Sequence, residues 1–431
     1  MIGLVLNVVA ATVLVIASIF RPGFGIGIAL VLGRHTFPDR ETPIAPLGPI
    51  VCAAALFGYW ISGRRLRLSP YSVAGVALTG LVVLVGAYRS TAYTNETIRM
   101  LADDKALFLA STVAPLLLLS GTLTDRDIRT DFFRSLVAVA TGLTTIMLLT
   151  NTGERSGALG GGPITLATAI GIALIVLIHF HDPLLGPELQ RFESGIRIVV
   201  GGVLALGMWM TQSRQPMFSL VLILGIAAFL GLSQDIRHAS SAKQLKRIRR
   251  LRLISLVMVV GAGAGLAQLV FGGAADTRFA LLANPVQEFE RSRNAVWEAG
   301  MEMARQAGAA GNGFGATVLS DGPTLVLYPH NIFLELWAEI GPVMSLVIYL
   351  AFFLGAITAV RKGNRVFTIL AGYALLGAQF SGDLYNSRSF YLFLVAALTV
   401  PPAMRALSTE HQSSDDAADS TSVPIRGGIA G

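Results

Sequence analysis

The stretch that decides the class of fold is residues 333–360, FLELWAEIGPVMSLVIYLAFFLGAITAV. Two glutamates lie in its first part, and every residue after Pro342 is uncharged. A helix needs about 20 mostly apolar residues to cross the ~30 Å hydrocarbon layer of a membrane. We therefore predict a membrane-spanning helix whose beginning adjoins a polar segment.

Similar apolar segments recur along the whole chain. We predict spans at residues 2–20, 43–62, 70–88, 106–121, 134–150, 163–180, 196–211, 216–234, 253–271, 333–360, 366–380 and 389–405. The glycine-rich stretch 21–33 is either a re-entrant piece or part of a longer first hairpin. No A-x-A cleavage site follows the first stretch, which favours a span over a signal peptide. The expected fold is an all-α polytopic membrane protein of about twelve transmembrane helices, with a long, partly helical outer loop before the tenth.

The composition agrees with this class. Hydrophobic residues make up 53% of the 431 residues and charged residues only 14%, whereas a soluble domain is about 25% charged. The net charge of +7 does not indicate nucleic acid as a partner, because the basic residues lie at predicted helix ends, where they meet lipid headgroups. The single cysteine, Cys52, excludes an intrachain disulfide.

Basic residues also indicate orientation, since cytoplasmic loops carry an excess of Lys and Arg. The densest run lies between Arg237 and Arg252, which favours both termini in the cytoplasm and residues 272–330 on the outer face. Only four of the 33 basic residues are lysine, which suggests a GC-rich genome and hence a bacterial cytoplasmic membrane protein. The Ser- and Asp-rich end is predicted to be disordered. We expect four regions: 1–271 with nine helices, 272–330 as an outer catalytic loop, 331–406 with three helices, and 407–431 as a cytoplasmic tail.

Three polar motifs crowd the outer loop and the start of the next helix. They are Arg293-Asn-Ala-Val-Trp297, Gly311-Asn-Gly-Phe-Gly315, and YPHNIFLELWAEIG over residues 328–341. A fourth, Gln212-Ser213-Arg214, precedes an earlier span. Loops held by a rigid scaffold often carry function, so we place the candidate site here.

The ordered set resembles the O-antigen ligase and polymerase family of bacterial membrane glycosyltransferases. Its members have R-x-x-x-W, G-x-G-F-G and H-N-x-x-L-E-x-x-A-E-x-G in this order, about twelve spans, and a long outer loop before the tenth. Two departures leave the subfamily open: Gln215 and Pro216 follow Arg214 where glycine is common, and Pro342 follows Gly341.

The resemblance implies a reaction at the outer membrane face. A glycan on a polyprenyl-diphosphate lipid is the donor, and the acceptor hydroxyl lies on a glycolipid, another glycan or a different envelope molecule. Ligase and polymerase differ in that acceptor. The course is expected to be inverting, with no metal and no cofactor.

Arginine suits the leaving diphosphate, because it keeps its charge and contacts phosphate oxygens in pairs. Arg214, at a predicted outer helix end, and Arg293, in the outer loop, are the candidates. The competing interpretations are structural. Arg214 is equally typical of an arginine that reaches the headgroups, and Arg293 of a salt bridge to Glu290 or Glu298.

His330 is the candidate general base, because imidazole titrates near neutral pH. Asn331 is predicted to cap the following helix. The field at that helix start favours an anion and the neutral imidazole. A phosphate-binding or capping role for His330 stays open, and Tyr328 is a candidate diphosphate or supporting contact.

The supporting candidates are acidic or glycine. Glu335 and Glu339 share one helix face, and carboxylates inside a span usually face a polar interior. We expect Glu335 to orient His330 or an arginine, and leave Glu339 open. Gly313 and its glycine neighbours either admit a ligand close to the backbone or form a flexible turn.

Two further interpretations complete the prediction. The adjacent acids Asp103 and Asp104 are expected to be solvated rather than metal ligands. The rival from another class is a transporter or lipid-linked glycan flippase. Transporters place ionisable residues near the bilayer midplane, whereas the richest polar cluster here lies in the outer loop.

Overall fold

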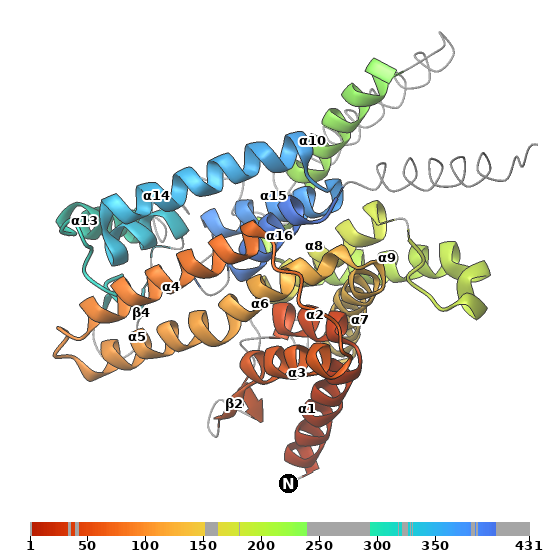
Figure 1. Ribbon diagram of the computed structural model, residues 1–431, viewed down its shortest axis with the longest axis horizontal. Helices are drawn as coiled ribbons and strands as arrows, with labels where there is room; N and C mark the ends of the chain where they lie inside the picture. Colours follow the sequence, from red (N-terminus) through yellow and green to blue (C-terminus); the bar gives the residue numbers. More distant parts are fainter. Residues whose placement is uncertain are drawn as a thin grey trace, which may run out of the picture.

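Helices dominate the computed structural model of the chain (Figure 1). It describes residues 2–32, 36–38, 43–150, 163–180, 182–238, 294–317, 319–320, 326–327, 329, 331–380, 384 and 387–401. The elements are α1 (Ile2–Phe20), α2 (Pro22–Leu32), β1 (Thr36–Pro38), β2 (Pro43–Pro46), α3 (Leu47–Ile61), α4 (Pro70–Ser90), α5 (Glu96–Phe108), the π-helical turn η1 (Leu109–Val113), α6 (Ala114–Leu119), the 3₁₀ turn η2 (Ser120–Thr124), α7 (Arg126–Thr150), α8 (Pro163–His179), the 3₁₀ turn η3 (Pro187–Phe192), α9 (Glu193–Met210), α10 (Arg214–His238), α13 (Asn294–Gln306), β3 (Leu319–Ser320), β4 (Val326–Leu327), α14 (Ile332–Lys362), α15 (Arg365–Phe380) and α16 (Arg388–Thr399). The short strands pair antiparallel, β1 with β2 and β3 with β4.

Five helical segments among the described residues are long and apolar enough to cross a membrane. They are Pro70–Ser90, Ile98–Thr124, Arg126–Thr150, Glu188–Met210 and Ile332–Arg361. Large apolar side chains point outward from them; Leu84 is 68% exposed and Leu346 67%. Such surfaces are unfavourable in water and suit hydrocarbon surroundings. The predicted helical membrane fold is thus confirmed in this coarse form.

The individual predicted spans correspond only in part to helices of the structure. Helices occupy the predicted spans within the described residues, several of them shorter than a full crossing. The predicted span 253–271 and the tail 407–431 lie outside the described residues. In the segment 272–330, for which we predicted some helix, α13 covers Asn294–Gln306. The count of twelve spans stays a prediction.

The first three helices pack against one another. A Cβ added to Gly58 of α3 would lie 1.9 Å from the carbonyl oxygen of Ile19, so the last turns of α1 and α3 touch. Residues 21–33, for which the sequence left open a re-entrant piece or part of a longer first hairpin, contain the short helix α2, and most of its residues are buried.

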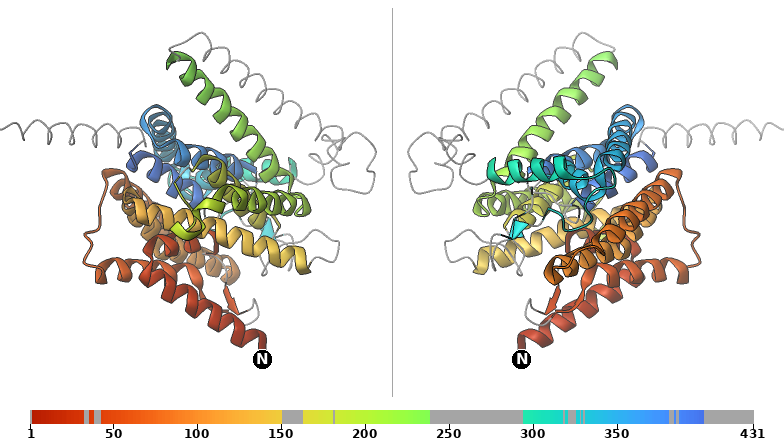
Figure 2. Two further views of the ribbon diagram at one scale, coloured as in Figure 1. Left: turned by 90° about the vertical axis from the view of Figure 1, so that its right-hand side faces the viewer. Right: turned by 90° about the vertical axis from the view of Figure 1, so that its left-hand side faces the viewer.

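Charged contacts gather at one end of the helices. Arg64, after α3, lies 3.2 Å from Asp125, and Arg126 lies 2.9 Å from Asp182. Arg21, at the end of α1, lies 3.4 Å from Asp131. These three arginines, from separate segments of the chain, thus meet acidic residues at one end of the structure. The N-terminal end of α1 points to the periphery in all views (Figures 1 and 2).

The buried helix α2 is held by α16. The Arg388 guanidinium, at the start of α16, is buried and donates to the carbonyl oxygens of Leu30 (2.8 Å) and Val31 (3.4 Å). These carbonyls end α2 and have no partner within the helix. An arginine from the far end of the sequence supplies their hydrogen bonds.

Candidate functional site

The site is built around a short helix at the start of α14. Asn331 caps it, its side-chain oxygen accepting from the amides of Phe333 (2.9 Å) and Leu334 (3.2 Å). The predicted N-cap is confirmed. At Gly341 the backbone leaves helical geometry, with φ 82° and ψ 165°, and Pro342 follows. Residues 332–340 therefore form a separate short helix before the long segment.

Both predicted carboxylates of this short helix contact one lysine. The Lys105 ammonium, on α5, lies 2.7 Å from each carboxylate oxygen of Glu339. It also donates to Glu335. All three side chains are buried, with 0% exposure for Glu339 and 5% for Lys105. An unpaired charge there would be very costly, so the three groups depend on one another.

Backbone amides complete this charged cluster. The Gly315 amide donates to Glu339 Oε1 and the Leu384 amide to Glu335 Oε2, each at 2.9 Å. The Phe314 ring lies under the ammonium, 5.6 Å from nitrogen to ring centroid. The two amides thus add directional hydrogen bonds to the carboxylates that face the ammonium.

The glycine motif, residues 311–315, binds the end of the short helix through backbone hydrogen bonds, and we call this turn the glycine clamp. The amides of Asn312 and Gly313 donate to the carbonyl oxygens of Ala338 (2.9 Å) and Glu339 (2.8 Å). A helix that breaks leaves such carbonyls without partners, and the turn supplies them. Since the Gly313 amide is already used, the geometry favours its supporting role over direct ligand contact.

The same turn is fastened to the end of α4. Arg89 Nε donates to the Gly311 carbonyl at 3.2 Å, and the Tyr93 hydroxyl donates to the Asn312 carbonyl at 2.8 Å. The Phe314 ring rests on Gly86, where an added Cβ would lie 2.4 Å from the ring. Burial, with a smaller effect of the Glu339 charge, raises the pKa of Tyr93 to about 12. Tyr93 is therefore neutral and able to donate over the whole physiological range.

The earlier motif forms a strained turn between α9 and α10. Gln212 has φ 49°, the sole positive value for a non-glycine residue in the described part of the chain. Such backbone geometry is typical of functional sites. The neighbouring Ser213 is buried. Arg214 then begins α10; only its backbone belongs to the described part, and the direction of its side chain is not assigned.

Two predicted motifs converge on the end of α15. The Gln215 amide nitrogen would lie 3.3 Å from a Cβ added to Gly377. The Asn331 amide lies 3.4 Å from both the carbonyl and the side-chain oxygen of Gln379. The start of α10, which carries Arg214, and the capped start of α14 thus meet the same last turns of one helix, although distant in sequence.

Three predicted site residues, Arg293, Tyr328 and His330, lie outside the described residues. Asp103 and Asp104 are exposed, as predicted. The important residue that sequence reasoning missed is Lys105. Its signal was available: two carboxylates one helical turn apart inside a span call for a buried cation, and the chain has only four lysines.

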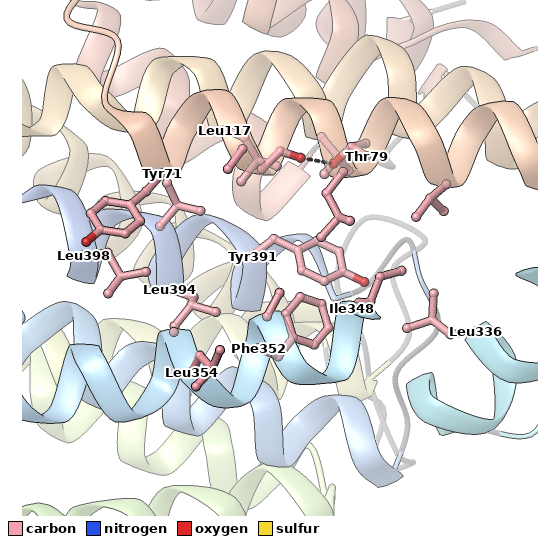
Figure 3. Close-up of a pocket in the computed structure, with 18 of the residues that line it drawn as sticks. Tyr71, Thr79, Leu117, Leu336, Ile348, Phe352, Leu354, Tyr391, Leu394 and Leu398 are labelled. Atoms are coloured by element: carbon pink, nitrogen blue, oxygen red, sulfur yellow. Dashed lines mark hydrogen bonds between the residues drawn. The ribbon is translucent and has the colours of Figure 1, made fainter. Parts of the chain in front are cut away.

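An apolar pocket of about 310 Å³ adjoins this cluster, between α4 and α14 and against α16 (Figure 3). Tyr71 and Leu398 line one end of it, and Leu336 and Ile348 line the other (Figure 3). Leu336 follows Glu335 in the short helix, and the lining residue Leu384 donates to Glu335. The lining of the pocket is therefore almost entirely apolar, and the Lys105 cluster lies behind its Leu336 and Leu384 end.

Within the described ranges, no three His, Cys, Asp or Glu side chains gather in a way that would hold a metal ion. Comparison with protein-family models, curated protein sequences and solved structures finds no match. Fold and site together define a helical protein with candidate membrane-spanning helices, in which a broken helix, a glycine clamp and a buried charged cluster meet at one end.

Proposed function

We propose that the chain transfers a glycan from a polyprenyl-diphosphate lipid to an acceptor hydroxyl at the outer face of a bacterial cytoplasmic membrane. The observation that carries the proposal is the meeting of the α10 start, with Arg214, and the α14 start, with Asn331, at the end of α15. The sequence motifs for diphosphate and for hydroxyl chemistry begin at these two helix starts.

The apolar pocket supports a lipid donor. An isoprenoid chain needs an apolar channel, and its diphosphate needs a polar end. The pocket suits the isoprenoid chain, because its lining is almost entirely apolar from Tyr71 to Leu336. In this proposal the diphosphate is bound by Arg214 and Arg293. A span-crossing carrier would instead need ionisable groups along its path, which the lining residues do not provide.

The proposed reaction is a single displacement. The acceptor oxygen forms a bond to the anomeric carbon while the bond from that carbon to the diphosphate oxygen breaks, with inversion. His330 accepts the hydroxyl proton. Arg214 and Arg293 neutralise the leaving diphosphate, and Asn331, Tyr328, Glu335 and Gly313 support these groups.

The test is transfer by purified protein from a polyprenyl-diphosphate glycan to glycolipid and glycan acceptors. We expect Arg214→Ala, Arg293→Ala and His330→Ala each to lower kcat by about 100-fold or more. Arg126→Ala, exposed at the opposite end, is the matched control. Acceptor choice separates ligase from polymerase. Wild-type rates in all three variants, or a donor that crosses liposomes without being consumed, would overturn the proposal and favour a flippase.

A further inference from the structure

The short helix 332–340 does not take its direction from the rest of α14. Gly341 leaves helical geometry, and Pro342 has no amide proton to continue the hydrogen-bond ladder. A continuous helix would fix its own first turns, but this one is separated by the break. Its direction depends on side chains and turns that reach it from other segments.

Lys105 is the centre of those contacts. Its ammonium joins α5 to both Glu335 and Glu339. Glu339 in turn accepts a hydrogen bond from the Gly315 amide in the glycine turn. Glu335 accepts one from the Leu384 amide in the segment before α16. One cation therefore links four separate parts of the chain through directional bonds.

The ionic character of this cluster is informative. Apolar side chains of similar volume would often stabilise a protein interior as well as a buried ion pair does. Hydrogen bonds differ from apolar contacts because they fix distance and angle. The cluster is thus suited to hold the short helix in one orientation.

We infer that Lys105 is a positioning residue, which sets the orientation of helix 332–340 and so the place of its cap, Asn331, and of His330 before it. The inference rests on the proposed glycan transfer. Lys105 acts through the helix and its carboxylates. Losing it displaces the reacting groups, which lowers kcat, while the apolar channel and the donor KM stay nearly unchanged.

The experiment compares the wild type with Lys105→Met, Lys105→Arg and Glu339→Gln in purified full-length protein. Asp104→Asn, exposed on the preceding residue, is the matched control. Two readouts are taken: kcat and donor KM, and amide hydrogen exchange over 332–340 against 126–150. We expect Lys105→Met to lower kcat about tenfold or more with less than about threefold change in KM. Exchange should accelerate in 332–340 alone, and Lys105→Arg should recover part of kcat.

The outcomes separate the two proposals. Unchanged kcat and unchanged exchange in Lys105→Met would overturn the positioning role, as would a loss carried by KM alone. A wild-type protein that transfers no glycan would overturn the proposed function and, with it, the role of Lys105 in transfer. If Lys105→Met does not accumulate, Lys105→Arg and Glu339→Gln decide the question by the same criteria.

Discussion

Gly311 and Gly341 face each other without room for a side chain on either. A Cβ on Gly311 would lie 2.4 Å from the Gly341 nitrogen, and one on Gly341 would lie 2.4 Å from the Gly311 nitrogen. Both have positive φ, 73° and 82°. The glycine motif and the break in α14 are therefore one structural unit, although the sequence shows them as separate motifs.

Alanine at Gly341 should disrupt this unit. The Cβ would meet backbone atoms in a conformation that favours glycine, so we expect Gly341→Ala to lower the free energy of unfolding by about 2 kcal/mol or more. Gly308→Ala is the control, because an added Cβ there meets nothing within 4 Å. Thermal unfolding in detergent measures both. Equal melting of Gly341→Ala and wild type would show that the close contact is absent.

Tyr93 predicts a loss of stability at high pH. The pKa of Tyr93 is about 12 in the folded protein, against the ordinary tyrosine value of 10.0. Below pH 10 both states keep the proton, so the stabilisation is complete. Between pH 10 and 12 the unfolded state loses the proton first, and stability falls as pH rises. Melting temperatures of wild type and Tyr93→Phe across this range test it, with Tyr88→Phe, an exposed ring, as control. The melting temperature of Tyr93→Phe should fall less than that of the wild type between pH 10 and 12. An identical fall in both proteins would contradict the prediction.

Filling the apolar pocket should weaken binding of a long-chain donor. Gly75 lines the pocket, whereas Gly80 of the same helix does not and has open space around it. We expect Gly75→Leu to raise KM about tenfold for a long polyprenyl donor and to change it little for a short-chain analogue, because contact with the chain is lost. Gly80→Leu should leave both values unchanged. An equal change in KM for the long-chain and the short-chain donor would show that the pocket does not bind the lipid chain.

Hydropathy was sufficient to locate the long helices. The uncharged stretch after Pro342 predicts a long apolar helix by composition alone. Asn331, which stands before an apolar run, predicts a helix cap by local chemistry alone. Local signals fail where the structure depends on distant partners. Hydropathy could not assign residues 21–33, because the buried helix α2 is too short to register as a crossing and is held by Arg388, which is distant in sequence.

The candidate site shows the same division. Glu335 and Glu339 were visible as a pair on one face, but their partner was assigned to a histidine or an arginine. Placing the span start at residue 106 left Lys105 in a loop, whereas the helix begins at Glu96 and carries Lys105 into the interior. A hydropathy average does not reveal a single buried cation. The charge lowers the average, so the predicted span begins after the cation and leaves it outside.

The hydrogen bonds from Arg388 to the end of α2 span 358 positions of sequence. During synthesis α2 therefore emerges long before the guanidinium that completes it. Until α16 is made, the Leu30 and Val31 carbonyls must find water or another donor, and the early helices cannot settle into their final packing. The final packing of the early helices is thus completed only after α16 has been synthesised.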